Sequence, residues 1–445
     1  MDIYSNKRVL IDSDNPSLCR DESICRKCGL CKLVCNRDMA VDGYYDPAKT
    51  GNSAVCVNCG QCLQACPFGS LKIINDMPQF LAAIKNPNKK VACILAPAVR
   101  VAFGELFGKA AGTNVAPQIV GLLKQMGVDF VFDTTFGADL TTMEEAAEFV
   151  LRLKTKSKLP MFSSCCPAWV KYAETFLPNY LNNLSTCRSP IGMQSAIIKT
   201  YFAKQKGLLP NDLYVVAITP CIAKKFEILR PEMCKANEYF CLGSAKDTDC
   251  VITTVELAQE TQERNINFDE IKPKKFDQIV GNGSGLGLGF GASGGVAQSV
   301  LKTAYYLLNG TPAPQNLVEL SPVEGNPALR RGKVNLGSKT VDVAAVYGTA
   351  KLKEFLILNQ NNLPDFIEVM ACPNGCVGGG GQPKCKPETL KARKMGILQS
   401  NKKQKITAAY QNPQIQELYA TFLKKPLSKT SKELLHTTFV DRSLT

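Results

Sequence analysis

Histidine is almost absent from the sequence, since His436 is the one histidine among 445 residues. One imidazole leaves little room for zinc sites of the mixed Cys/His type. A nucleophilic triad built on His436 is not expected either, because this residue stands in a polar C-terminal tail. Any metal ligands of this chain are therefore expected to be thiolates.

Long apolar segments are missing too. The longest, around Val91–Val99, is far shorter than the ~20 residues that a membrane-spanning helix needs. The first residues, Met1–Ser5, include an acid and no apolar stretch, so a secretory signal is not predicted. We therefore expect a cytoplasmic protein that does not enter a membrane.

Cysteine, in contrast, is abundant, with 20 residues. A chain that is not secreted keeps its cysteines reduced, and reduced cysteines in clusters are typical of metal sites. Because imidazole is scarce, the expected metal is iron in iron–sulfur clusters, or zinc bound by thiolates alone.

The net charge of +14 is unevenly distributed along the chain. Residues 384–445 hold 13 basic and 4 acidic side chains, whereas residues 1–85 are about neutral. The basic tail has two interpretations, a solvated helical surface or a docking face for an acidic partner. Nucleic acid is not an expected partner, because base-reading motifs and interleaved aromatic side chains are missing.

The composition along the chain predicts three domains. The first domain, residues 1–85, is rich in closely spaced cysteines. In the second, residues 91–385, apolar strands alternate with helices such as Thr142–Lys154 and Ala297–Leu308. The third, residues 386–445, is expected to be a basic helical extension packed on the outside. The alternation indicates an α/β domain with a largely parallel sheet. The expected strands are Val91–Pro97, Asp129–Phe132, Leu159–Phe162, Tyr214–Ile218, Cys250–Thr253, Val341–Tyr347 and Phe366–Ala371.

Two cysteine quartets with the same spacing lie in the first domain. They are Cys25-x2-Cys28-x2-Cys31-x3-Cys35 and Cys56-x2-Cys59-x2-Cys62-x3-Cys66. With this spacing, three thiolates of one loop hold a cubane and the fourth reaches the neighbouring cubane. The predicted ligands are Cys25, Cys28, Cys31 and Cys66 for one [4Fe–4S] cluster, and Cys35, Cys56, Cys59 and Cys62 for the other. The segment resembles an α+β two-cluster bacterial ferredoxin, which conducts electrons and leaves the chemistry to another part of the chain.

Three further cysteine motifs each follow a predicted strand of the large domain. They are Ser163-Ser164-Cys165-Cys166-Pro167, Thr219-Pro220-Cys221-Ile222-Ala223-Lys224 and Met370-Ala371-Cys372-Pro373-Asn374-Gly375-Cys376. Ligands gather at the carboxyl ends of the strands in α/β sheets, so these motifs could converge on one site. Four of the cysteines would supply the thiolates of a third cubane, and Cys165 would lie beside it.

Together the motifs resemble the three signatures of the [FeFe]-hydrogenases, over nearly the whole chain and in the short two-cluster form. The resemblance implies a two-lobed α/β catalytic domain and the reversible reduction of protons to H₂. It also implies an H-cluster, in which a cubane is joined through Cys376 to a diiron unit with CO, cyanide and azadithiolate ligands. The implied cubane ligands are Cys166, Cys221, Cys372 and Cys376.

The same resemblance implies roles for residues around the H-cluster. Lys224 would donate a hydrogen bond to a cyanide, and Cys165 would pass protons to the bridge amine. The groups implied around the diiron unit are Pro97, Ala98, Phe290 and Met370. The implied proton relay consists of Glu145, Ser185, Glu148 and Arg152, with Glu227 as a second candidate.

Four positions depart from the family pattern. Ser163 replaces the usual threonine of the first motif, and Thr219 replaces the usual methionine of the second. Ala98 stands where a serine is common, and Ile191 where a glutamine is common. These changes indicate a variant branch that keeps the cluster ligands and the Cys165 thiol.

Other functions remain as alternatives. A Narf-like iron–sulfur assembly protein would lack the diiron unit, but Cys165, Lys224, Glu227 and Met370 are all present. A hydrogen sensor would carry an added signalling domain. An NAD-linked oxidoreductase would need a nucleotide-binding loop. Gly289–Gly294 matches the pattern G-x-G-x-x-G, but no acidic residue follows about 20 positions later, as such a loop requires. The favoured interpretation of these glycines is a close approach of the backbone to a buried group.

The resemblance also implies partners. A reduced ferredoxin or flavodoxin is expected to exchange electrons with the chain, since acidic electron carriers are attracted to a basic protein. Dedicated hydrogenase maturases are expected to build the diiron unit and insert it.

Overall fold

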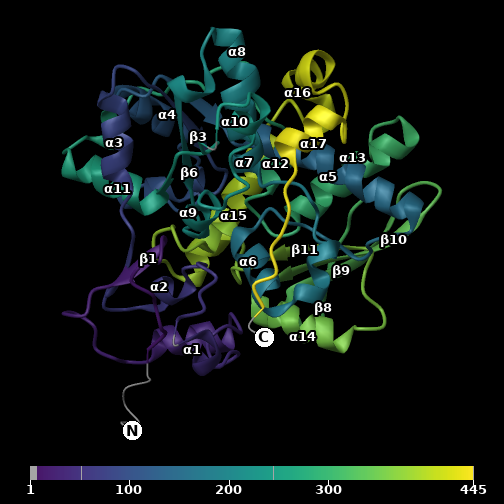
Figure 1. The fold of residues 1–445 in the computed structure, drawn as a ribbon, viewed down its shortest axis with the longest axis horizontal. Helices are drawn as coiled ribbons and strands as arrows, with labels where there is room; N and C mark the ends of the chain where they lie inside the picture. Colours follow the sequence, from purple (N-terminus) through teal and green to yellow (C-terminus); the bar gives the residue numbers. More distant parts are fainter. Residues whose placement is uncertain (1–7, 52, 244, 444–445) are drawn as a thin grey trace.

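The computed structural model describes residues 8–51, 53–243 and 245–443. The prediction made from Met1–Ser5 falls outside these ranges. Figure 1 shows an N-terminal segment, two lobes with one larger sheet each, and a C-terminal extension that returns across both lobes. Within the described ranges, no helix is long and apolar enough to cross a membrane.

The N-terminal segment consists of two short helices and a two-stranded ribbon. The ribbon pairs β1 (Leu18–Arg20) with β2 (Leu71–Ile73) in antiparallel fashion, so it joins the two ends of the segment. The helices α1 (Leu30–Arg37) and α2 (Gln61–Ala65) each follow a glycine in the left-handed conformation, inside a cysteine quartet. The repeated spacing of the quartets thus produces two similar loop–helix units.

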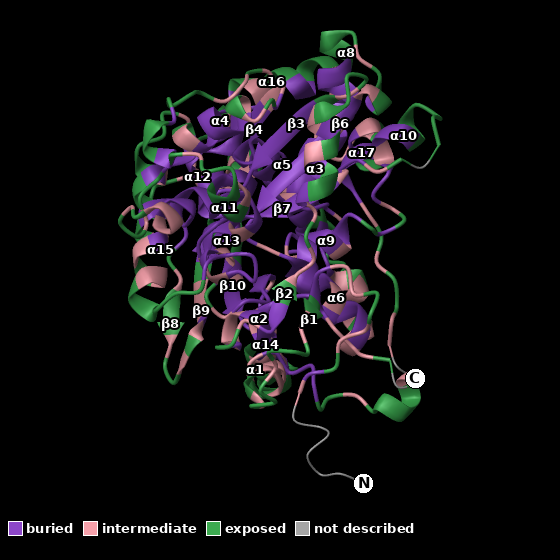
Figure 2. Cartoon of the chain, turned by 90° about the vertical axis from the view of Figure 1, so that its left-hand side faces the viewer, coloured by how far each residue is buried: buried purple, intermediate pink, exposed green. Residues whose placement is uncertain are grey.

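The first lobe contains a fully parallel four-stranded sheet with the strand order β4-β3-β6-β7. Its strands are short apolar runs that are almost completely buried (Figure 2), as expected when both faces of a sheet are covered. The strands are β3 (Lys90–Leu95), β4 (Phe130–Asp133), β6 (Leu213–Thr219) and β7 (Cys250–Thr253). The helices of this lobe are α3 (Met77–Lys85), α4 (Ala116–Gln125), α7 (Pro190–Ile197), α8 (Ala203–Lys206), α9 (Ala223–Glu227), α10 (Lys235–Tyr239) and α11 (Thr254–Glu263).

Helix α3 lies before the predicted domain boundary at residue 85. Its buried side chains Met77 and Phe80 nevertheless belong to the same apolar core as Val91 and Leu95 of β3. The predicted linker is a tight turn between α3 and β3. The core of the first lobe therefore begins earlier in the chain than the composition indicated.

The second lobe contains a mixed five-stranded sheet with the order β5-β11-β10-β9-β8. β5, β11 and β10 are parallel, and β9 and β8 form an antiparallel edge. The strands are β5 (Met161–Phe162), β8 (Ser321–Val323), β9 (Asn326–Asn335), β10 (Thr340–Tyr347) and β11 (Phe366–Met370). α5 (Thr135–Thr155) and α13 (Gly295–Asn309) pack in one core cluster with the sheet, and α6 (Pro167–Phe176) and α14 (Thr349–Leu358) pack in another.

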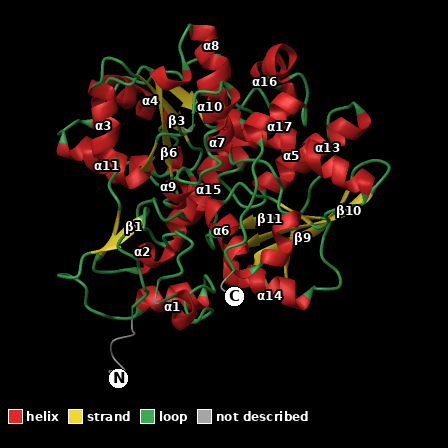
Figure 3. Cartoon of the chain, in the orientation of Figure 1, coloured by secondary structure: helices red, strands yellow, loops and turns green. Residues whose placement is uncertain are grey.

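The remaining helices connect the lobes and form the extension (Figure 3). They are α12 (Gly285–Gly289), α15 (Pro387–Lys402), α16 (Pro413–Leu418) and α17 (Lys429–Leu435). Ile415 of α16 and Leu434 of α17 are buried in the same apolar core as Phe136 of α5 and Ile197 of α7. The extension therefore contributes side chains to the core around α5 and α7.

The predicted strands are all present, but they are divided between two sheets and do not form the single largely parallel sheet that the residue pattern indicated. β8 and β9 were missed because most of their residues are half-buried or exposed, and Pro327, Gly332 and a charged run interrupt the apolar pattern. Helix α5 begins at Thr135, well before the predicted Thr142, because its first turns are buried all round and show no amphipathic period.

Candidate active site

The three cysteine motifs of the large domain meet in one cavity of about 100 Å³ between the two lobes. The first motif follows β5, the second follows β6 and the third follows β11, so both sheets present the carboxyl ends of their strands to the cavity. All four predicted cubane ligands line it, namely Cys166, Cys221, Cys372 and Cys376. The sequence placed these cysteines at strand ends but could not show that two separate sheets would bring them together.

The four cysteines form a donor set suited to an iron–sulfur cluster. Burial, followed by repulsion between neighbouring thiolates, raises the pKa of Cys221 to about 12 and raises that of Cys372 well above its ordinary value. Burial also raises the pKa of Cys166 and Cys376. An all-sulfur set that lines one cavity is the ligand type of a [4Fe–4S] cluster.

Close backbone contacts hold the second and third motifs against each other. A Cβ atom added to Gly379 would lie 2.3 Å from the carbonyl oxygen of Pro220, so only glycine allows this approach. The amide of Ala371 points at the sulfur of Cys166, with N and Sγ 3.5 Å apart. Such amide–sulfur contacts stabilise the anionic form of a bound cluster.

Cys165 and Lys224 face the same cavity. Burial raises the pKa of Cys165 well above its ordinary value, so this thiol keeps its proton at neutral pH. Lys224 pairs with Glu227 at 2.7 Å, and its Nζ also donates to the carbonyl of Cys165 at 3.3 Å. Although burial alone would lower it, the pKa of Lys224 is raised by the Glu227 carboxylate and the nearby thiols, so the cavity contains a fixed ammonium.

The apolar groups expected around the H-cluster also line the cavity. Pro97, Ala98, Phe290 and Met370 are all present in its wall. Three of the four positions that depart from the family pattern line the cavity as well, namely Thr219, Ala98 and Ile191. The fourth, Ser163, is completely buried, and its hydroxyl accepts a hydrogen bond from the Val369 amide at 3.1 Å. Gly291, from the glycine-rich stretch, is also a wall residue, in agreement with the expected close backbone approach.

The predicted relay residues lie together beside the cavity. Glu145 and Glu148 come from α5, one turn apart. The hydroxyl of Ser185 donates to Glu148 Oε2 at 3.2 Å, and Arg152 binds Glu148 Oε1 through Nη2 at 2.6 Å. Neither carboxylate oxygen of Glu145 has a hydrogen-bond partner among the described residues. Burial and then repulsion from Glu148 raise the pKa of Glu145 to about 8, so this side chain can gain and lose a proton near neutral pH.

Two polar residues that no sequence motif indicated, Thr186 and His436, extend the hydrogen bonds of this relay. Thr186 donates to Glu148 Oε2 through both its amide and its hydroxyl, at 3.0 Å in each case. The same hydroxyl lies 2.7 Å from Nδ1 of His436, whose ring is almost completely buried. His436 stands in a polar stretch of sequence, but the fold buries its side chain. About 290 residues of sequence separate His436 from Glu144, its other partner, so no local pattern could have predicted the contact.

The pH dependence of unfolding should change when Glu145 is replaced by glutamine. Its pKa rises from an ordinary value of 4.5 to about 8 in the folded protein, so the native state loses stability as the pH rises between these two values. Glu145→Gln abolishes this loss. Between about pH 5 and about pH 9, the free energy of unfolding of the variant should therefore rise by a few kcal/mol relative to that of the native sequence. Denaturant unfolding of both proteins at the two pH values measures the difference, and an equal response to pH would contradict it.

Two smaller cavities in the N-terminal segment each contain four cysteines. Cys25, Cys28, Cys31 and Cys66 line one, and Cys35, Cys56, Cys59 and Cys62 line the other. These are the two sets predicted from the spacing. Although burial opposes it, hydrogen bonds from Ser70 and backbone amides lower the pKa of Cys66 to about 7, which favours the thiolate that a cluster requires.

The second of these cavities adjoins the main one. Gly60 has a left-handed φ of 74°, and a Cβ atom there would lie 2.8 Å from the Cα of Gly380. Gln64 Nε2 donates to the carbonyl of Gln382 at 2.8 Å. Cys59 lies so close to Cys372 that, after burial, repulsion between the two thiolates raises the pKa of Cys372. The N-terminal segment thus contacts the third motif directly.

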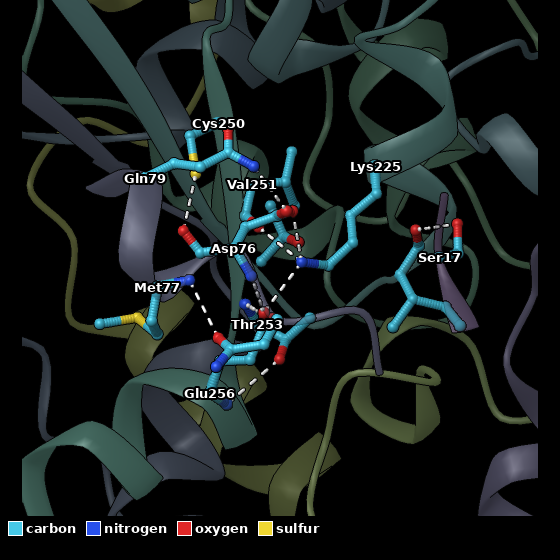
Figure 4. Close-up of polar contacts among 12 residues, drawn as sticks. Ser17, Asp76, Met77, Gln79, Lys225, Cys250, Val251, Thr253 and Glu256 are labelled. Atoms are coloured by element: carbon cyan, nitrogen blue, oxygen red, sulfur yellow. Dashed lines mark hydrogen bonds and ion pairs between the residues drawn. The ribbon is translucent and has the colours of Figure 1, made fainter. Parts of the chain in front are cut away.

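The N-terminal segment is also fixed to the loop of the second motif (Figure 4). Lys225 is buried and forms ion pairs with Asp76 at 2.6 Å and with Glu256 at 2.9 Å. The hydroxyl of Ser17 donates to the carbonyl of Ile222 at 2.9 Å, one residue beyond Cys221. The loop that presents Cys221 is therefore positioned by residues of the N-terminal segment and of the first lobe together.

Comparisons with known proteins agree with this geometry. Residues 89–380 match the family described as iron-only hydrogenase large subunit, C-terminal domain, and residues 387–442 match the iron hydrogenase small subunit. The chain is 38% identical to the NADP-reducing hydrogenase subunit HndD of Solidesulfovibrio fructosivorans, over 98% of this chain and 75% of that protein. The chain belongs to the [FeFe]-hydrogenase family.

Solved structures show the same relationship. A variant of the [FeFe]-hydrogenase HydA1 from Chlamydomonas reinhardtii superposes with a TM-score of 0.73 at 35% identity, and the match covers 83% of this chain and 100% of that one. The cytosolic Fe-S cluster assembly factor narfl of Danio rerio is more distant, at 30% identity over 79% of this chain and 86% of that protein. As a member of the [FeFe]-hydrogenase family, the protein is an iron–sulfur oxidoreductase with a mixed α/β catalytic domain.

Proposed function

We propose that this [FeFe]-hydrogenase catalyses the reversible reduction of protons to H₂ at an H-cluster bound in the main cavity. The observation that carries the proposal is the convergence of four cysteines, a protonated thiol and a fixed ammonium on one cavity. Cys166, Cys221, Cys372 and Cys376 would hold the cubane, and Cys376 would also join it to the diiron unit. When bound, the H-cluster supplies the electrons and the iron at which protons combine to H₂.

The surrounding side chains bind and shield the cofactor in this proposal. Lys224 would bind an anionic ligand such as cyanide, because its ammonium faces the cavity and remains charged. Pro97, Ala98, Phe290 and Met370 would exclude water from the site. Glu227 holds Lys224 in place through its ion pair, so we assign it a positioning role.

Protons would move through side chains that can hold them. Cys165 Sγ carries a proton at the cavity wall, and Glu145 titrates behind it. Ser185 and Glu148 continue the path away from the cavity. Arg152 binds Glu148 Oε1 through both Nε and Nη2, so we assign it the task of orienting the Glu148 carboxylate.

Two [4Fe–4S] clusters in the N-terminal segment would conduct electrons to the cavity. The grouping of the eight cysteines into two cavities supports the two ligand sets, and the contact of Gly60 with Gly380 supports the direction of the path. The cavity that contains Cys25, Cys28, Cys31 and Cys66 is also lined by cationic side chains, and Cys28 is exposed. These cations are Arg8, Arg20, Arg26 and Lys27.

This basic rim would bind an acidic ferredoxin or flavodoxin. The double variant Arg26→Glu/Lys27→Glu should reduce hydrogen evolution driven by reduced ferredoxin about tenfold at low salt, because charges at the rim of an interface control the association rate. Evolution driven by reduced methyl viologen, a small cation, should not fall. The control variant Lys402→Glu/Lys403→Glu reverses the same charge on the exposed end of α15. A larger effect of the control would place the docking site on the basic extension.

Hydrogen evolution by the full chain produced with hydrogenase maturases tests the function itself. Protein made with the maturases should evolve H₂ from reduced methyl viologen, and protein made without them should contain cubanes but remain inactive. The alternative is a Narf-like assembly protein or a hydrogen sensor. No evolution by protein that was produced with active maturases and contains its three cubanes would favour that alternative. Against it stand Cys165, Lys224 and Met370, which all face the cavity.

A further inference from the structure

A lysine of helix α6 reaches the smaller cysteine cavity that adjoins the main one. The four cysteines of this inner cysteine cavity are Cys35, Cys56, Cys59 and Cys62. Helix α6 begins directly after Cys166 of the main cavity, and it carries Lys171 in its middle. Lys171 Nζ donates a hydrogen bond to Asn58 Oδ1 at 2.7 Å. Because Asn58 directly precedes Cys59, the ammonium is held against a loop that lines the inner cysteine cavity.

Asn58 is completely buried, and its side-chain amide has a partner on each side. Its Nδ2 donates to Asn15 Oδ1 at 3.1 Å, and this oxygen also accepts from two backbone amides. Asn58 therefore presents its nitrogen to Asn15 and its oxygen to Lys171. Its backbone amide, at a left-handed φ of 58°, donates to Cys56 Sγ at 3.4 Å. One residue thus connects the ammonium with the sulfur of a predicted ligand.

Lys171 has no ion pair with a carboxylate within the described ranges. Glu174, one turn further along α6, pairs with Arg230 and Arg442 instead. The ring of Phe226, whose centre lies 3.9 Å from Lys171 Nζ, provides a cation–π contact but no negative charge. The side chain of Lys171 is half-buried. Burial of an ammonium without a counterion is costly, so another anion is expected close to it.

The thiolates of the inner cysteine cavity can provide this anion. Burial lowers the pKa of Lys171, and the strongest influence in the opposite direction is the negative charge of Cys56. A cubane with four thiolate ligands is anionic, and it gains a further negative charge when it accepts an electron. An ammonium at this position therefore stabilises the reduced form more than the oxidised form.

We propose that Lys171 raises the reduction potential of the cluster in the inner cysteine cavity through the charge of its ammonium. This inference rests on the proposed function, in which the cavity holds a [4Fe–4S] cluster that receives electrons from the redox partner through the other N-terminal cluster. Because Cys59 lies close to Cys372, this site would be the last carrier before the main cavity. Lys171 would thus help to keep an electron beside the site where protons are reduced.

A lysine on α14 provides a matched control. Lys353 is half-buried like Lys171, and its Nζ also lies 3.9 Å from the centre of an aromatic ring, that of Tyr44. Burial lowers its pKa as well, and within the described ranges burial is the single cause of that shift. Lys353→Met therefore removes a similar charge and a similar ring contact without removing a charge that acts on a cysteine.

A redox titration of the full chain, followed by electron paramagnetic resonance, tests the proposal without reference to hydrogen turnover. The chain is produced without maturases, so that the signals come from cubanes alone. Cys56→Ser identifies the transition of the inner cluster, because it changes a ligand of that cluster only. In Lys171→Met, the ratio of reduced to oxidised inner cluster at a fixed potential should fall roughly threefold to tenfold, a shift of about 30–60 mV to more negative potential.

Further variants separate the charge of Lys171 from its contacts. Lys171→Gln, which is neutral but retains a donor for Asn58, should shift the same transition in the same direction as Lys171→Met. Lys171→Arg keeps the charge and should keep the potential. Lys353→Met should leave all transitions in place. An inner transition of Lys171→Met and Lys171→Gln at the native potential would overturn the proposal, as would equal shifts in Lys171→Arg or in Lys353→Met.

Iron and sulfide analysis of the same samples separates this proposal from the function on which it rests. Native protein with fewer than three cubanes would refute the two clusters of the N-terminal segment, and the role of Lys171 with them. Three cubanes and unmoved transitions in the neutral variants would refute the role of Lys171 alone. Loss of the inner cluster from both neutral variants, with retention in Lys171→Arg, would replace the tuning of the potential by a role of the charge in cluster binding.

Discussion

Replacing Cys165 with alanine is expected to remove nearly all hydrogen turnover while every iron–sulfur cluster is retained. The thiol is the proton-bearing group of the first motif at the cavity wall, and burial keeps its proton in place at neutral pH. Alanine cannot carry a proton, so the rate should fall by about 10²-fold or more. Hydrogen evolution from reduced methyl viologen, with iron and sulfide analysis of the same samples, measures both quantities.

The control for this variant is Cys93→Ala. Cys93 lies on β3 and is buried like Cys165, but it belongs to the apolar core of the first lobe. This variant should lose some stability and keep its turnover per cluster. Substantial hydrogen evolution by Cys165→Ala would refute the role of the thiol, and loss of iron from that variant would assign Cys165 to cluster binding.

Glu148→Gln should slow turnover by about 10²-fold. Glutamine retains the volume of the side chain and an oxygen that can accept from Ser185 and Thr186, but it cannot take up a proton. The infrared spectrum of the cofactor should remain recognisable, because Glu148 is not among the residues of the cavity wall.

A second buried carboxylate provides the comparison for Glu148→Gln. Glu174 on α6 is completely buried and pairs with Arg230 and Arg442, outside the proposed proton path. Glu174→Gln removes an equally buried charge and should affect stability more than turnover. Equal rates for the native sequence and Glu148→Gln would show that protons reach the cavity by another route.

The grouping of the cysteines around three cavities was predictable from the sequence because it depends on local patterns. The spacing from Cys25 to Cys35 and from Cys56 to Cys66 fixes two tight loops, and these loops line separate cavities with the expected partners. Cys166, Cys221 and Cys372 come directly after apolar strands, where α/β proteins place ligands. Lys224 and Glu227 are three residues apart on α9 and pair across one turn.

The rest of the site depends on contacts between distant parts of the chain. Two sheets border the cavity, although the residue pattern alone indicated one, because the sequence shows each strand but not its neighbour. His436 contacts Glu144 and Thr186 only because α17 packs into the core beside α7. The contact of Lys225 with Asp76 and Glu256 brings together three elements that have no shared sequence pattern.

The sequence shows Thr219 in place of the usual methionine and Ala98 in place of a common serine. It does not show which part of the site these two changes alter. Both residues line the cavity, so both changes alter the immediate surroundings of the proposed cofactor. Thr219 Oγ1 donates to the carbonyl of Cys221 at 3.1 Å, so the hydroxyl stabilises the turn of the second motif.

The central claim is that the main cavity binds a diiron unit with CO and cyanide ligands. An infrared spectrum of the full chain, matured under anaerobic conditions, tests it most directly, because amino acids do not absorb in the region where these ligands stretch. We predict sharp carbonyl and cyanide bands that shift when H₂ is added. A spectrum without such bands, from protein that contains its three cubanes and was produced with active maturases, would contradict the claim.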